Sequence, residues 1–197
     1  SNVEQPEIIK LSHSTVLIKN FISLEEEEKL ARYALSQQSD AGQQKSVKRA
    51  RLYQALSKYP KPKFLEEICH RAVKASQSVA SKLPDIDLTH LLMVYYYAGT
   101  PGMDWHRDSD ENDGLNDHPI VSVSIGNQCT FGYKPLMQKE QFVTLESRSC
   151  IVWGGSERML MHCVKQVHDN TAPKRLEKIT GNMRVNFTFR SARKNQF

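Results

Sequence analysis

The chain has 197 residues, of which 39% are hydrophobic and 25% charged, with a formal net charge of +5. These values are ordinary for a globular protein and fit one domain with a sizeable core; no internal repeat or low-complexity tract is present. No apolar run approaches the roughly 20 residues of a membrane-spanning helix, and no signal-peptide pattern precedes the first predicted helix. The four cysteines show no paired spacing, so we expect free thiols in a reducing, intracellular compartment, cytoplasmic or nuclear.

The first third of the chain is predicted to be mainly helical. Residues 23–35, SLEEEEKLARYAL, open with a capping box, in which Ser23 precedes Glu26 by three positions. Leu24, Ala31 and Leu35 would form the buried stripe of this helix. A second helix is predicted from about residue 62 to residue 83, with apolar side chains at helical spacing, namely Leu65, Ile68, Ala72, Ala75 and Val79.

Between these helices lies a polar, basic segment without strong periodicity. Residues 41–65 contain seven Lys or Arg residues and no acid, with Tyr53 and Tyr59 interleaved. A run of charge is most often a solvated face. Basic groups can also follow phosphates, however, and aromatic rings can stack on bases. We interpret this segment as a surface lid, and its basic residues are Lys45, Lys48, Arg49, Arg51, Lys58, Lys61 and Lys63.

From residue 90 onward the hydrophobic period changes to two. The strand candidates are residues 90–98, 119–126, 129–134, 141–146, 149–154, 157–164 and 182–190. Many short strands after two helices indicate an α+β fold, with a double-stranded β-helix (jelly roll) and the N-terminal helices packed on its sheet. We therefore predict a single domain over residues 1–197. Residues 1–89 would supply helical support and the basic lid, and residues 90–190 the jelly-roll core.

A candidate metal site begins at His106 and Asp108, in the stretch MDWHRDSDEND. Alternate residues of a strand project to the same side, so an imidazole nitrogen and a carboxylate oxygen would lie close together. Two histidines and one carboxylate leave coordination positions open, which is the arrangement of non-haem Fe(II) oxygenases. His162, inside the apolar pattern MLMHCV, is the best candidate for the third ligand, although a histidine in such a strand is more often a hydrogen-bonded core residue. His168 lies in a turn-rich segment and is a weaker candidate.

The last strand candidate, RVNFTFR at residues 184–190, carries two arginines on one face. Arg184, Asn186, Thr188 and Arg190 alternate there with apolar residues. If this face points to water, it needs no special explanation. If it points into a barrel, two guanidinium groups would be costly unless an anion meets them. A dicarboxylate would suit, because a guanidinium can hold a carboxylate through paired hydrogen bonds.

The order of these motifs resembles the AlkB family of Fe(II)- and 2-oxoglutarate-dependent dioxygenases. His106-x-Asp108 is followed by WGGSERMLMH, which ends at His162, and then by RVNFTFR. The strand PIVSVSIG also resembles the family. The resemblance covers about residues 90–190, and the first third matches in layout only. It implies a jelly-roll oxygenase that uses Fe(II), 2-oxoglutarate and dioxygen.

The resemblance assigns the iron and its cosubstrate to particular residues. His106, Asp108 and His162 would hold Fe(II). Arg184 would pair with the distal carboxylate of 2-oxoglutarate, and Arg190 would lie close to the carboxylate nearer the metal.

Further positions match the family in part. Asn186 would add an amide hydrogen bond, and Tyr97 would contact the cosubstrate. The chain departs from the family at Tyr95, where an asparagine is frequent. Asp110 matches a carboxylate that accepts a hydrogen bond from the exocyclic amine of the target base, and its alternative interpretation is a solvated acid in an acidic loop.

The family's activity implies oxidative demethylation of N-alkylated bases of the 1-methyladenine or 3-methylcytosine type, in DNA or RNA. The products would be succinate, CO2 and formaldehyde, and the base would be single-stranded or flipped out of its stack. Contacts with nucleic acid would come from Lys48, Arg49, Arg51 and Tyr53. We expect a monomer with no membrane partner. Two alternatives are a 2-oxoglutarate-dependent hydroxylase or demethylase of a protein or small molecule, and a catalytically inactive jelly-roll module that binds nucleic acid.

Overall fold

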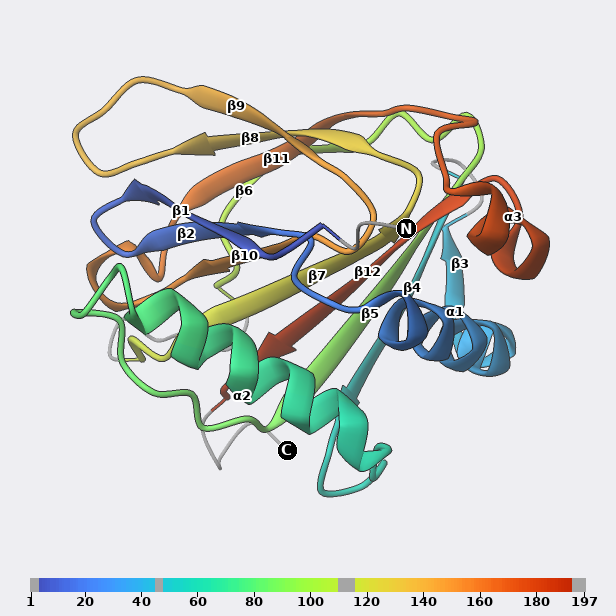
Figure 1. Ribbon diagram of the computed structural model, residues 1–197, viewed down its shortest axis with the longest axis horizontal. Coiled ribbons are helices and arrows are strands. Elements are labelled where there is room, and N and C mark those ends of the chain that lie inside the picture. The colour runs from blue at the N-terminus through green and yellow to red at the C-terminus, as the bar shows by residue number, and fades with distance from the viewer. Residues whose placement is uncertain (1–3, 45–47, 110–115, 193–197) are drawn as a thin grey trace.

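The computed structural model describes residues 4–44, 48–109 and 116–192, which form two β-sheets and three α-helices (Figure 1). The larger sheet has eight strands, in the order β1 (Glu7–Ser12), β2 (Thr15–Lys19), β10 (Cys150–Trp153), β7 (Ile120–Gly126), β12 (Met183–Arg190), β5 (His90–Tyr97), β4 (Arg49–Ala55) and β3 (Gly42–Gln44). The smaller sheet has four strands, in the order β6 (Met103–His106), β11 (Met161–Val167), β8 (Cys129–Lys134) and β9 (Gln141–Leu145). All the pairings are antiparallel.

The large sheet lies between the helices and the small sheet (Figure 1). On one face, Val121 and Phe187 belong to the main core cluster, together with residues of α1 (Leu24–Gln37), α2 (Lys63–Gln77) and α3 (Lys174–Thr180). On the other face, Leu92 and Val94 pack with Phe131 of the small sheet. Alternate residues of each central strand therefore enter different cores. The predicted α+β jelly roll with helices packed on its sheet is confirmed.

The seven strand candidates after residue 90 all correspond to strands. Their ends differ by a few residues, most of all for β11, which begins at Met161 because residues 155–157 form a short 3-10 helix. α3 was not predicted, since the residues that precede it read as turns. The four cysteines are free and buried, as expected.

α1 begins with the predicted capping box, but its buried stripe differs from the predicted one. Leu24 and Leu35 are 43% and 48% exposed. The helix instead turns Glu27 inward, where its carboxylate pairs with Arg175 of α3. The buried stripe consists of Glu27, Leu30, Ala31 and Ala34. The helix is therefore rotated so that Glu27, and not Leu24 or Leu35, faces the interior.

α2 is shorter than predicted and ends at Gln77. Leu65, Ile68 and Ala72 are buried in it, whereas Val79 lies beyond its end and is 36% exposed. No helix among residues 4–44, 48–109 and 116–192 is both long and apolar enough to cross a membrane.

The segment predicted as a surface lid is largely part of the sheet. β4 pairs with β5 along its whole length, from Arg49 opposite Tyr96 to Ala55 opposite His90, and β3 adds the edge strand. The first third also contains the β1–β2 hairpin, which pairs with β10. The description of residues 1–89 as helices and a lid was therefore wrong for these strands. The sequence did not indicate β4 as a strand. One of its faces carries Arg49, Arg51 and Tyr53, and the face toward the helices has few large apolar residues.

Candidate metal and cosubstrate site

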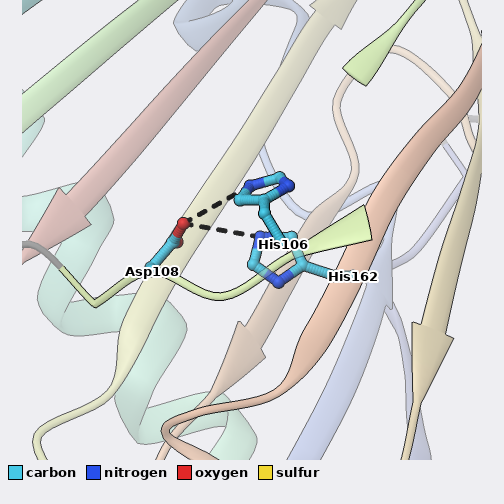
Figure 2. A group of neighbouring side chains, drawn as sticks. All are labelled: His106, Asp108 and His162. Atoms are coloured by element: carbon cyan, nitrogen blue, oxygen red, sulfur yellow. Dashed lines mark ion pairs between the residues drawn. The ribbon is translucent and has the colours of Figure 1, made fainter. Parts of the chain in front are cut away.

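The two strands β6 and β11 bring His106 and His162 together. The two residues lie directly opposite one another in the register, and Asp108 follows two residues after β6 ends. Figure 2 shows both imidazole rings facing the carboxylate of Asp108. The Nε2 atoms of His106 and His162 lie 3.5 and 3.6 Å from Oδ1 of Asp108. One ligand atom from each of the three residues lies within 4.8 Å of the others, so the predicted group is assembled and could hold a metal ion.

Backbone carbonyls fix the orientation of both rings. Nδ1 of His106 lies 2.7 Å from the carbonyl oxygen of Asp104, and Nδ1 of His162 lies 2.8 Å from that of Leu160. A carbonyl oxygen only accepts hydrogen bonds, so each Nδ1 carries a proton, and Nε2 is the ring nitrogen left to bind a metal. Such outer contacts fix a metal-binding tautomer. The donor set therefore fits Fe(II), with two imidazole nitrogens and one carboxylate.

The electrostatic surroundings keep Asp108 ionised. Its side chain is buried, and Nη2 of Arg190 lies 3.1 Å from its Oδ2. Burial raises the pKa of Asp108, but hydrogen bonds from His106 and His162 and the charge of Arg190 outweigh burial and hold the pKa well below its ordinary value. Arg158 donates from Nη1 to the backbone oxygen of Asp108 at 2.7 Å, which anchors the turn.

The weaker histidine candidate lies outside this group. Nε2 of His168 and the hydroxyl of Thr130 are 2.8 Å apart, so that ring is held at the other end of β8. The ring of His162, in contrast, lies 4.8 Å from that of Trp153 and 5.8 Å from that of Phe131. These two aromatic neighbours limit the positions that the imidazole can adopt.

The polar face of β12 points into a cavity and not to water. The cavity is lined by His106, Asp108 and His162 and, from β12, by Arg184, Asn186, Thr188 and Arg190. These four β12 side chains are at most 8% exposed. Because these side chains are buried, the polar face of β12 points into the barrel, which is the interpretation in which an anion is needed to meet the two arginines.

Arg184 is a buried cation that lacks a full set of partners. It is 1% exposed, and its Nη2 donates to the hydroxyl of Ser124 at 2.9 Å. Its Nε and Nη1 atoms have no hydrogen-bond partner within the described parts of the chain. Unsatisfied donors on a buried cation are costly, and a carboxylate is their natural complement. The residues therefore fit a cosubstrate that carries a carboxylate group.

The amide of Asn186 is already hydrogen-bonded within the protein. Its Nδ2 donates to the hydroxyl of Ser122 at 2.7 Å, and its Oδ1 accepts from the hydroxyl of Thr188 at 2.6 Å. Asn186 still lines the cavity. A direct amide contact with a cosubstrate remains a prediction.

The register corrects the expectation for Tyr97. Residues directly opposite in an antiparallel pair share a face, and Tyr96 is opposite Arg184. Tyr96 accordingly lines the cavity, and the guanidinium carbon of Arg184 lies 5.8 Å from its ring centre. Tyr97 packs against the helix-side core, and its hydroxyl accepts a hydrogen bond from Gln38 at 3.2 Å. Tyr95 also faces that side and donates to the carbonyl of Ala34.

The β4 strand continues the cavity face of the large sheet beyond β5, and β3 is the edge strand that follows it. Arg49, Arg51 and Tyr53 lie opposite Tyr96, Val94 and Leu92, so their side chains share the face that carries the cavity. Arg51 and Tyr53 are exposed, and Tyr53 stacks on the ring of His90 at 5.0 Å. Nη1 of Arg49 donates to the carbonyl of Gly102 at 2.8 Å.

Lys48 and Asp110 were also predicted from the sequence to contact the substrate. Lys48 is exposed just before β4, and its backbone oxygen accepts hydrogen bonds from the backbone of Tyr97 and the hydroxyl of Thr100. Asp110 lies outside the residues that the structure describes.

Some cavity residues were missed in the sequence. They are Tyr96, Ser122, Leu92, Val94 and Phe131, and Ser124 supports Arg184 from the same strand as Ser122. The alternating serines of PIVSVSIG could have indicated a polar inner face, because period-two alternation separates the faces of a strand.

Comparison with known proteins agrees with this geometry. The family model of the 2OG-Fe(II) oxygenase superfamily matches residues 14–190. A protein named DNA N(6)-methyladenine demethylase ALKBH1C, from Arabidopsis thaliana, is 33% identical over 152 residues, which are 66% of this chain and 32% of the relative. The alpha-ketoglutarate-dependent dioxygenase AlkB of Salmonella typhimurium is 32% identical over 133 residues, which are 66% of this chain and 56% of the relative. The chain thus spans less than two thirds of either relative.

The solved structure of OsALKBH1 has the same fold. It superposes with a TM-score of 0.80 and 21% identity, over 94% of this chain and 100% of that one.

Proposed function

Because the chain belongs to the 2OG-Fe(II) oxygenase superfamily, in its AlkB branch, we propose that it removes methyl groups oxidatively from ring or exocyclic nitrogens of nucleobases. The family uses Fe(II) and 2-oxoglutarate, as the sequence predicted. The observation that carries the proposal is the cavity between the two sheets, where the candidate metal group of the small sheet shares a lining with the buried Arg184 of the large sheet, and the basic strand β4 continues that face of the large sheet.

The residues around the cavity have distinct proposed roles. His106, Asp108 and His162 would hold Fe(II), which with bound 2-oxoglutarate supplies the activation of dioxygen. Arg184 would bind the distal carboxylate of the cosubstrate through its unsatisfied donors. Arg190 would hold Asp108 in place through their ion pair. The apolar walls would exclude water from the reaction.

The substrate chemistry then follows from hydroxylation of a methyl group bound to nitrogen. The product carries a hydroxyl and an amine nitrogen on the same carbon, so the carbon–nitrogen bond breaks. The carbon leaves as formaldehyde and the nitrogen regains a proton. Dioxygen would be the oxidant: one of its oxygen atoms would enter the methyl group and the other 2-oxoglutarate, which supplies the other two electrons and leaves as succinate and CO2.

A nucleic-acid substrate is supported by strand β4 and by the relatives. Arg51 and the exposed ring of Tyr53 lie on the cavity face, where they would follow a phosphate backbone and stack on a base. One relative is named as a demethylase of N6-methyladenine in DNA, and this chain would act on the same class of polymer. We further propose a monomer, with the target base single-stranded or flipped into the cavity. Asp110 remains our candidate for contact with that base.

The test is release of formaldehyde and succinate from matched substrates. DNA and RNA oligonucleotides carrying N6-methyladenine, 1-methyladenine or 3-methylcytosine would be compared with a methylated peptide, and His162→Ala would serve as the inactive control. We expect formaldehyde from at least one oligonucleotide class and none from the peptide. Release from the peptide alone would replace this proposal with the protein-hydroxylase alternative.

A further inference from the structure

The β8–β9 hairpin ends in an apolar tip that is exposed to solvent. The backbone N–H of Gln138 donates to the carbonyl of Pro135 at 3.1 Å, which closes a turn with Leu136 and Met137 at its centre. Leu136 is 67% exposed and Met137 is 98% exposed. Two adjacent apolar side chains therefore project from the protein with almost no packing of their own.

The backbone conformation at Met137 is unusual for a methionine. Its φ is +58°, in the left-handed region where glycine or asparagine is the ordinary residue of a turn. A residue other than glycine is strained in that conformation. The exposed side chain of Met137 cannot offset that strain by packing within the molecule. Packing within the molecule therefore does not account for a methionine at this position.

The tip lies next to the candidate active site. Tyr133 of β8 is directly opposite His162, which is itself opposite His106. β8 ends one residue later, so the turn begins about 7 Å beyond the level of the two histidines, at about 3.3 Å per residue. Figure 1 shows this turn projecting at the far left of the small sheet. Between the tip and residues 159–161 lies a cavity of about 330 Å³.

The surroundings of the tip are predominantly cationic. Lys134 and Lys139 are exposed on its two sides, and Arg107 lines the cavity beside it. Glu140 is an exposed acid that follows Lys139. Glu157 also lines the cavity, but its carboxylate is buried and accepts hydrogen bonds from residues of the β1–β2 hairpin. An apolar tip with a cationic rim is complementary to a polymer that has an anionic backbone and an apolar interior.

We propose that Leu136 and Met137 form a wedge that enters the base stack of a duplex beside the nucleotide turned into the cavity. The inference rests on the proposed function, since it takes the substrate to be a nucleic acid. Apolar side chains, Leu and Met among them, open base steps in this way in other proteins. The wedge occupies the gap that the flipped base leaves, and the lysines hold the phosphates on either side.

The experiment places 2-aminopurine, whose fluorescence rises when it unstacks, next to a methylated base in duplex DNA. Binding is followed without oxygen, so that no turnover occurs. The variants are Met137→Gly and the double variant Leu136→Ser with Met137→Gly. Leu24→Ser is the matched control, because Leu24 is 43% exposed on α1, on the helix side of the large sheet. We expect wild type and control to raise the fluorescence several-fold, Met137→Gly to lose at least half of that rise, and the double variant to lose nearly all of it.

Two further readouts separate a wedge from a structural role. Met137→Gly should melt at the same temperature as wild type or higher, because glycine relieves the backbone strain. Binding to the single-stranded oligonucleotide should stay within twofold for every variant.

Three results would overturn the wedge. They are an equal fluorescence rise in all the proteins, an equal loss of single-strand and duplex binding, and a change of sedimentation in the variants with unchanged fluorescence, which would make the tip a contact between copies of this chain. Formaldehyde release from single strands by wild type and variants alike would leave the proposed function standing in each of these cases.

Discussion

Replacing Arg184 by methionine should change the stability and the cosubstrate affinity of the protein in opposite directions. The side chain is 1% exposed, and two of its nitrogens have no hydrogen-bond partner within the described residues. Methionine fills a similar volume without a charge. The variant loses the hydrogen bond to Ser124, worth about 1 kcal/mol, but it also removes a buried cation whose desolvation is incompletely compensated.

The size of both effects follows from the hydrogen bonds that Arg184 would make to the cosubstrate and from the burial of its charge. A forked pair with a carboxylate supplies two charged hydrogen bonds, of about 1.5–3 kcal/mol each. Losing about 3–4 kcal/mol in total corresponds to a rise of roughly 10²–10³-fold in the Kd for 2-oxoglutarate. In the absence of cosubstrate, the relief of the buried charge should stabilise the fold by about 1 kcal/mol, or about 2–4 °C in Tm.

Calorimetric titration of 2-oxoglutarate into the Mn(II)-loaded protein would give the Kd, and scanning calorimetry without cosubstrate would give the Tm. Arg184→Lys is the matched control, because it keeps the charge but loses the fork, and it should recover little affinity. An unchanged Kd in Arg184→Met would refute the cosubstrate assignment. A Tm lower by several degrees would show that the guanidinium serves the fold itself.

Three further predictions concern the metal group, strand β4 and the two neighbouring tyrosines. His162→Ala should abolish Fe(II)-dependent succinate formation and His168→Ala should not, and the reverse pattern would make His168 the third ligand. Arg51→Gln should weaken nucleic-acid binding and lower the slope of log K against log salt by about 1, with substrate-free turnover of 2-oxoglutarate unchanged; an unaltered slope would make the charge a solvated one. Tyr96→Phe should raise the KM for 2-oxoglutarate several-fold, whereas Tyr97→Phe should lower only the Tm, by a few degrees, through its lost bond to Gln38; equal kinetic effects would contradict the assignment of their faces.

The sequence determined those features that depend on neighbours along the chain. Period-two alternation located the strands of the jelly roll, and the spacing of Ser23 and Glu26 identified the cap of α1. The types and order of His106, Asp108 and His162 indicated Fe(II) chemistry before any contact was known. The alternation and the capping box are local signals, because the side-chain period of a strand and the capping of a helix are set within a few residues.

Only the tertiary structure decided which face of each element points inward. Alternation divides the residues of β12 between two faces, but the packing of the small sheet on the large one made the face of Arg184 the buried one. The register between β5 and β12 then placed Tyr96 in the cavity and Tyr97 outside it. A shift of one residue exchanges the two faces of a strand, and the pairing that prevents it joins residues far apart in the chain. For the same reason β4 became part of the sheet, since its polar sequence is a strand only because β5 offers it a partner along its whole length.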